Sequence, residues 1–419
     1  MYSSKWSRLD NAAKIFPPNT TKDDTKVFRL SCELYEAVDP GILASALGAA
    51  LDRFPLYRFI IRRGFFWYYF TPSDLQPLVR EEYKVPCAPL YDVNRKNLLF
   101  EVTYWKMRIN LEAYHALSDG AGALQFFKTI VYHYLLERHG MDETVRLDSS
   151  DASDEQKGGD PFDRFYSKGR VPTMPRAPRA YRVRGARFPE SRVGIIEGRL
   201  STGALIGKAR SCQATISEFL TALLISAIHE GMTSRDEERP VSITVPVDLR
   251  KYFGGGSAAA RNFFGLINVS HNFRLQGGSF REVLEEVKRS YKSQLRPEKL
   301  YERLNLLLAF EHALYIKMVP LAIKVPALKT AARTADRGNS ASFSNMGKIS
   351  MPPAMVPHIR LFGVFYGAKG PHVCLCSFED NLAISFLSPF VSRDIQRAFF
   401  RSLSALGLDI EIVSNLGEG

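Results

Sequence analysis

The middle of the chain constrains the fold most, because a polar and then basic stretch separates two segments of domain length. Residues 148–159 are acidic and polar, and the stretch "GRVPTMPRAPRAYRVRGARFP" at 169–189 is rich in proline and arginine. This composition is typical of a linker. We therefore predict an N-terminal lobe over residues 1–165, a basic linker over 166–194 and a C-terminal lobe over 195–419. With 45% hydrophobic residues in 419, each lobe can bury a core.

Strand-like and helix-like patterns alternate in both lobes. Helices are predicted over 39–55, 123–140, 216–231, 279–295 and 392–407, with Asp39 and Ser217 as caps and Gly140 as a terminator. Strands are predicted over 25–38, 57–72, 97–116, 239–250, 340–349, 359–367 and 372–389, the second of them a hairpin that turns near Gly64. Long parallel strand–helix–strand regularity is missing. The fold class is therefore α/β or α+β.

Composition excludes several classes of protein. The formal net charge is +12, and residues 168–192 hold eight of the Lys and Arg residues with one acid, but no zinc-finger spacing or aromatic RNA-binding signature accompanies them. Five scattered cysteines do not form a disulfide framework. The most apolar run, 304–329, is broken by charges and prolines and predicts no membrane span. We expect a soluble, cytoplasmic monomer that does not bind nucleic acid.

One short stretch, "EAYHALSDGAGALQFF" at 112–127, places a histidine and an Asp-Gly pair where a strand gives way to a helix. In the structural interpretation, Asp119 caps the helix, Gly120 eases the bend and His115 is a histidine at a strand end. In the chemical interpretation, His115 presents a ring nitrogen to a cleft and acts as a general base. A buried Asp119 then needs a cation, and Arg250 at the end of "VPVDLR" is the candidate.

Four segments in order carry a family resemblance: "YHALSDGAGALQFF", "VPVDLR", "RNFFGLINVS" and "SFSNMGKI". Together with the opening "WSRLDNAAKIFP", they resemble the acyltransferase superfamily with the His-x-x-x-Asp-Gly motif. This group includes nonribosomal condensation domains, polyketide-associated acyltransferases and alcohol O-acetyltransferases. The chain looks most like the alcohol acetyltransferase branch. The similarity covers nearly the whole chain.

The resemblance implies two chloramphenicol-acetyltransferase-like lobes in a V-shape, with a tunnel between them. It also implies that His115 is the catalytic histidine, that Asp119 and Gly120 are structural motif residues, and that Arg250 is the salt-bridge partner of Asp119. The expected activity is transfer of an acyl group, with acetyl the first expectation, from acyl-CoA to a hydroxyl or amine of a small molecule. No bound cofactor is expected.

Two other functions stay open. A free-standing condensation-type enzyme would take its acyl group from the phosphopantetheine arm of an acyl carrier protein, which a basic linker could meet. A scaffold of the same fold would bind without transferring. The chain also departs from parts of the family, since Tyr114 stands where condensation domains carry a first histidine, and the plant signature Asp-Phe-Gly-Trp-Gly is absent.

Direct transfer needs hydrogen-bond donors for an oxyanion and cations for the donor's phosphates. The oxyanion and tunnel candidates are polar residues that follow C-terminal strands: Ser342, Ser344, Asn345 and Asn268. The phosphate candidates are Arg333, Arg337 and Lys348. Each also has a structural interpretation, as a turn polar or a solvated basic face.

We predict no metal site. His372, Cys374 and Cys376 share one strand face, but three ligands at spacing two spread over about 13 Å, so we interpret them as core residues. His133 and His139 lie six apart on a predicted helix, which does not put them on one face, and His358 has no partner spacing.

Overall fold

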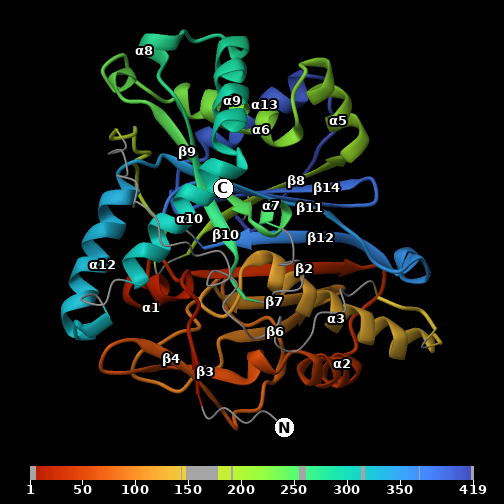
Figure 1. Cartoon of the computed structure of the whole chain (residues 1–419). Helices are drawn as coiled ribbons and strands as arrows, with labels where there is room; N and C mark the ends of the chain where they lie inside the picture. The colour runs from red at the N-terminus through yellow and green to blue at the C-terminus, as the bar shows by residue number, and fades with distance from the viewer. Residues whose placement is uncertain are drawn as a thin grey trace.

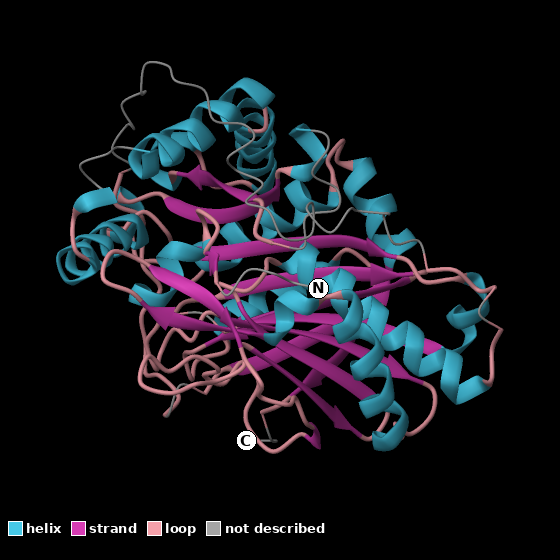
Figure 2. Ribbon diagram, turned by 60° about the horizontal axis from the view of Figure 1, so that its bottom comes forward, coloured by secondary structure: helices cyan, strands magenta, loops and turns pink. Residues whose placement is uncertain are grey.

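The computed structural model describes residues 6–142, 144–147, 178–189, 192–253, 261–312, 317–367 and 369–416. Figure 1 shows two lobes, with the N-terminal part of the chain below and most of the C-terminal part above. In the turned view of Figure 2 the strands run through the middle of the molecule and helices lie outside them. The predicted mixed α/β class and two-lobe architecture are confirmed. About half of the predicted linker, residues 178–189 and 192–194, is described, and the rest of it lies outside the described residues.

The N-terminal lobe is built on a five-stranded sheet whose order is β12-β2-β7-β6-β5. Its strands are β2 (Val27–Leu34), β5 (Val79–Glu81), β6 (Phe100–Trp105), β7 (Arg108–Tyr114) and β12 (Ile359–Tyr366). A smaller sheet joins β1 (Ser7–Arg8), β4 (Tyr68–Pro72) and β3 (Phe59–Arg63), and the last two form the predicted hairpin.

Two long helices, α2 (Pro40–Arg53) and α3 (Gly120–His139), pack against each other in this lobe. Asp39 caps α2 by accepting from the backbone N–H groups of Gly41 and Ile42, as predicted. Gly140 ends α3 in the left-handed conformation at φ 57°. The shorter elements nearby are η1 (Ala13–Ile15), α1 (Phe16–Asn19) and η2 (Pro55–Arg58).

The C-terminal lobe is built on a seven-stranded mixed sheet of order β10-β9-β11-β13-β14-β8-β15. Its strands are β8 (Gly194–Ser201), β9 (Val241–Asp248), β10 (Phe264–His271), β11 (Ala341–Ile349), β13 (His372–Phe378), β14 (Asn381–Ser388) and β15 (Glu411–Ser414). Strand β11 is parallel to both of its neighbours and is irregular between Asn345 and Lys348. The strand predicted over 340–349 is therefore confirmed, with a bulge inside it.

Three helices, α6 (Ile216–His229), α9 (Phe280–Gln294) and α13 (Asp394–Ala405), gather on the outer side of this sheet (Figure 1). The other C-terminal helices are α5 (Thr202–Ser211), η4 (Asp236–Glu238), α7 (Arg250–Phe253), α8 (Phe273–Gln276), α10 (Pro297–His312), α12 (Leu321–Asp336) and η5 (Pro353–His358). The cap of α6 is Thr215 rather than the predicted Ser217. Thr215 and Glu218 form a reciprocal capping box, which satisfies two backbone donors at once.

Strand β12 ties the lobes together. It lies after the linker in sequence, yet it pairs with β2 from the N-terminal lobe over seven residue pairs. One continuous hydrophobic core contains β2 and β7 residues together with residues of β13 such as Cys374, Cys376 and Phe378. The predicted lobe boundaries stay a prediction, but the segment 195–419 supplies an edge strand to the first lobe.

No single helix among the described residues is both long and apolar enough to cross a membrane. Helices α5 and α6 meet the length and composition criteria only when they are taken together, and they are bent by 79°.

Candidate functional site

A cavity of about 2430 Å³ lies between the lobes. Drug-sized ligand pockets usually measure about 300–1,000 Å³, so this cavity has room for two reactants. Its lining comes from His115 after β7, the start of α3, strands β9 to β13, and helices α10 and α12. Whether it opens through two faces, as the tunnel hypothesis requires, stays a prediction.

His115 lies in this cavity, one residue after β7. Its backbone N–H donates to the carbonyl of Lys26 at 2.8 Å, which continues the pairing of β7 with β2. Four aromatic rings surround the imidazole, and the nearest is Phe16, stacked at 4.6 Å between centroids; the others are Phe28, Phe264 and Tyr366. Burial among them lowers the pKa of His115 below its usual range, although the charge of Asp119 acts in the opposite direction.

Asn262 and Asp10 orient the His115 ring. Asn262 Nδ2 donates to Asp10 Oδ2 at 3.2 Å, and Asn262 Oδ1 lies 3.1 Å from His115 Nδ1. A carboxylate only accepts, so the amide group turns its NH₂ to Asp10 and its oxygen to the histidine. His115 Nδ1 then carries the proton, and Nε2 keeps its lone pair. This is the tautomer of a neutral general base whose reactive nitrogen is Nε2.

Asp119 and Arg250 form a buried clamp between the lobes. Asp119 is 4% exposed, and its two oxygens lie 2.9 and 3.2 Å from Nη1 and Nη2 of Arg250. The same carboxylate accepts from the backbone N–H of Gly122 at 2.9 Å and of Phe263 at 2.7 Å. The predicted ion pair is therefore present, in bidentate geometry. Because Phe263 directly follows Asn262, the clamp also holds the segment that contacts His115.

The four oxyanion candidates all line the cavity, but they differ in how their side chains are engaged. The Asn345 amide is occupied at both ends, since it donates to Ser217 and accepts from Gly347. Asn268 accepts from Thr244, and Ser342 accepts from Asn339. Within the described part of the chain, the Ser344 hydroxyl forms no hydrogen bond.

Three comparisons place this geometry among known proteins. No family model matches the sequence, and no curated protein matches it either. The fold, in contrast, matches solved structures along nearly the whole chain. An F. sporotrichioides TRI101 structure complexed with coenzyme A and T-2 superimposes with a TM-score of 0.67 at 11% identity, over 98% of this chain and all of that one.

The first condensation domain of the calcium-dependent antibiotic synthetase superimposes with a TM-score of 0.64 at 14% identity, over 98% of this chain and 100% of that one. The TRI3 trichothecene 15-O-acetyltransferase from Fusarium sporotrichioides superimposes with a TM-score of 0.60 at 12% identity, over 95% of this chain and 93% of that one. The chain has the condensation-domain fold. The resemblance drawn from the four sequence segments is thus confirmed at the level of the fold.

The three phosphate candidates differ in their position relative to the cavity. Arg337 lines the cavity, next to Arg179 and Arg182 from the described end of the linker. Arg333 and Lys348 are not among the lining residues, and Lys348 lies 3.9 Å from Glu379 in an exposed pair. A role for any of the three in binding phosphate stays a prediction.

Sequence reasoning missed two residues that the fold brings to the site, Asp10 and Asn262, and it interpreted a third, His372, only as a core residue. Asp10 and Asn262 stand in segments quoted for the resemblance, but their pairing spans 252 residues and no local pattern shows it. The interpretation of His372 as a core residue was incomplete, because this buried side chain lines the cavity. Cys374 also lines it, whereas Cys376 is fully buried and donates to the carbonyl of Phe362.

The fold also brings His139 and His358 into contact, although nothing in the sequence indicated that they form a pair. Their rings stack at 3.7 Å, and His139 Nε2 lies 2.8 Å from Glu36 Oε1. Ligand atoms of these three residues lie within 4.8 Å of one another. The three side chains therefore form a candidate ligand set, and the prediction that the chain has no metal site stays a prediction.

Proposed function

We propose that the protein is an acyltransferase that moves an acyl group from a thioester to a hydroxyl of a small molecule, with His115 as general base. The observation that carries the proposal is the position of His115, which lines a large cavity between the lobes while Asn262 and Asp10 engage Nδ1 and leave Nε2 as the basic nitrogen. The burial that lowers the pKa of His115 supports it, because it keeps the base neutral.

The reaction balances without a covalent enzyme intermediate. Nε2 of His115 accepts the proton of the acceptor hydroxyl while its oxygen attacks the thioester carbonyl, and the carbonyl electrons move onto oxygen. Ser344, whose hydroxyl is free to donate, is our choice for stabilising that oxyanion. When the carbon–sulfur bond breaks, the thiolate leaves and receives the proton from His115. An ester and a free thiol are the products.

Acyl-CoA is the proposed donor. Neighbouring structures of this fold were solved with coenzyme A or with C8-CoA, the latter in the starter condensation domain of rhizomide synthetase. The cavity lining of this chain supports the same chemistry with an arginine group, Arg179, Arg182 and Arg337, which suits phosphates. The acceptor class is argued further below, and an alcohol acetyltransferase activity is the specific form that we propose.

The test is acceptor-dependent release of free thiol from acetyl-CoA and longer acyl-CoAs, measured with a panel of alcohols and amines. The proposal predicts saturable release with at least one pair and a matching ester or amide in the product mixture. Release only from an acyl carrier protein would replace CoA with the carrier as donor. Release from neither donor, with intact binding of acceptors, would indicate the non-catalytic scaffold instead.

A further inference from the structure

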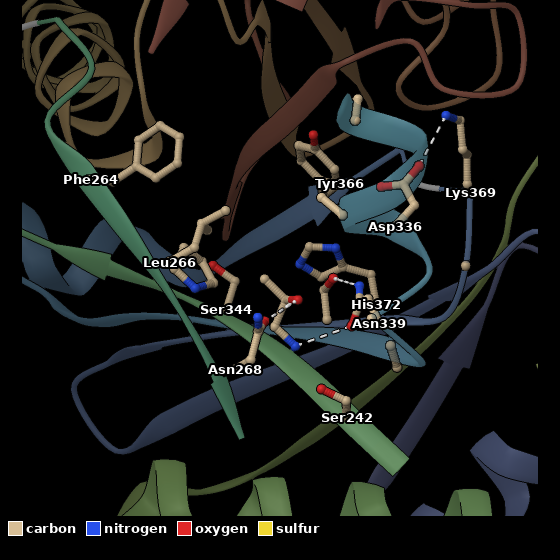
Figure 3. A pocket seen from close by; sticks show the side chains of 18 of the residues that line it. Ser242, Phe264, Leu266, Asn268, Asp336, Asn339, Ser344, Tyr366, Lys369 and His372 are labelled. Atoms are coloured by element: carbon tan, nitrogen blue, oxygen red, sulfur yellow. Dashed lines mark hydrogen bonds and ion pairs between the residues drawn. The ribbon is translucent and has the colours of Figure 1, made fainter. Parts of the chain in front are cut away.

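His372 is the most unusual polar residue of the cavity. It begins β13, is 7% exposed, and lines the cavity at the wall made by the C-terminal sheet. Figure 3 shows its ring pointing into the space beside Tyr366 and Ser344. Neither ring nitrogen has a hydrogen-bond partner among the described residues.

Four of the neighbouring polar side chains on this wall are paired with one another. Asn339 donates to Ser342, and Thr244 donates to Asn268, as the dashed lines of Figure 3 mark. The Ser344 hydroxyl is also without a partner among the described residues, but Ser344 is only half-buried. His372 is buried, and a buried polar group without a partner costs stability unless a ligand meets it.

The protonation state of His372 restricts what that ligand group can be. Burial, together with the nearby His115, lowers the pKa of His372 to about 4, so the ring is neutral at neutral pH. A neutral imidazole offers one N–H donor and one lone pair. It therefore suits a neutral group that both donates and accepts, such as a hydroxyl, and suits a phosphate or carboxylate poorly.

Its distance from the base also restricts the ligand. Tyr366 contacts both histidines, with its ring centroid 6.0 Å from that of His115 and 5.0 Å from that of His372. The two imidazoles are thus at most about 11 Å apart, and one molecule can reach both. The aromatic rings around His115 form an apolar wall beside this polar one, which suits a bulky carbon framework.

We propose that His372 binds the acceptor, and that the acceptor is a bulky, largely apolar alcohol with a second hydroxyl within a few carbon atoms of the reacting one. The proposal rests on the function proposed above, because it takes His115 as the residue that activates the first hydroxyl. His372 holds the second hydroxyl and thereby selects which oxygen reaches His115.

The experiment compares cyclohexanol with cyclohexane-1,3-diol and cyclohexane-1,4-diol as acceptors of acetyl-CoA. Wild type is expected to favour at least one diol by about 10-fold to 100-fold in kcat/KM, the size of one or two neutral hydrogen bonds. H372L is expected to lose that preference while its rate with cyclohexanol and its KM for acetyl-CoA stay unchanged. H372N, which keeps a donor and an acceptor, should recover part of the preference.

H358Q is the matched control, because it changes a histidine that does not line the cavity. A folding defect is recognised by the melting temperature, which should not fall in H372L, since leucine removes an unpartnered buried polar group. A diol preference missing in wild type, or an equal loss on all three acceptors in H372L, overturns the proposal. A raised KM for acetyl-CoA in H372L also overturns it, because that result would show that His372 binds the amide groups of the donor's pantetheine arm and not the acceptor.

Binding without turnover separates this proposal from the proposed function. The same three alcohols are titrated against wild type and H372L without acyl-CoA, and saturation-transfer NMR reports their binding. If the protein binds diols preferentially through His372 but transfers no acetyl group, the acceptor-site proposal stands and the acyltransferase proposal is refuted. If wild type binds diols and cyclohexanol equally, the acceptor-site proposal is refuted.

Discussion

At the scale of single residues, the site depends on side chains that hold His115 rather than on His115 alone. Asp10 fixes the amide of Asn262, and that amide fixes the proton on Nδ1. Asp119 and Arg250 hold the segment that carries Asn262. The motif residues and the cavity residues therefore form one connected support.

The pH dependence of transfer follows from the lowered pKa of His115. Only the neutral ring can accept a proton, so kcat/KM should fall as pH drops through that pKa, with the acid limb below the usual histidine value of about 6.5. N262L should lower kcat about tenfold or more and leave the acceptor KM nearly unchanged, because the ring loses its preferred tautomer. Rate profiles from pH 4.5 to 9 measure both. An acid limb above pH 7, or an unchanged kcat in N262L, would contradict this role.

Replacement of Asp119 should destabilise the fold. D119N retains a helix cap but removes the bidentate partner of Arg250, which then keeps only the partly exposed Asp248, 3.0 Å away, as a charged partner, so we expect a cost of about 3 kcal/mol in the free energy of unfolding. The control is D52N, in the exposed pair Asp52–Arg58, which should cost less than about 1 kcal/mol. Urea unfolding measures both. Similar losses of stability in the two variants would show that the Asp119–Arg250 pair contributes no more than an exposed ion pair.

At the scale of elements, local chemistry was predictable and long-range pairing was not. The Asp39 cap, the Gly64 hairpin and the Gly140 terminator each depend on residues a few positions apart, and the structure confirms them. The pairing of β12 with β2 joins residues more than 300 positions apart. The contact of Asn262 with His115 likewise joins residues that lie far apart in the sequence. Residue types could suggest the base and its motif, but only the tertiary fold could supply these partners.

The same substitution should have opposite effects at two helix glycines. Gly140 has φ 57° at the end of α3, so G140A should destabilise by about 1 kcal/mol. Gly48 is exposed inside α2 with nothing near its missing Cβ, so G48A should stabilise by about 0.5–1 kcal/mol. Melting temperatures of the two variants check this. Shifts of equal sign would contradict the assigned backbone conformations.

At the scale of the whole molecule, the lobes share structure that makes them interdependent. Strand β12 completes the N-terminal sheet, one core spans both sheets, and the Asp119–Arg250 clamp bridges the cavity edge. The cavity walls come from both lobes, so the shape of the cavity depends on how the two lobes are positioned relative to each other.

Calorimetry should therefore show one cooperative unfolding transition, with calorimetric and van't Hoff enthalpies nearly equal. D119N should lower its midpoint without splitting it. Two separate transitions in wild type would show that the lobes unfold independently, and would weaken the account in which a rigid relation between them positions His115.

The most direct test of the central claim is transfer of an isotope-labelled acetyl group from acetyl-CoA to an acceptor alcohol by wild type and by H115A. Mass spectrometry detects the labelled ester, and circular dichroism confirms that the variant is folded. The account predicts that H115A loses about 10²–10⁴-fold in ester formation, with no label attached to either protein. Equal ester formation by the folded variant, or label retained on the protein, would contradict direct transfer with His115 as the base.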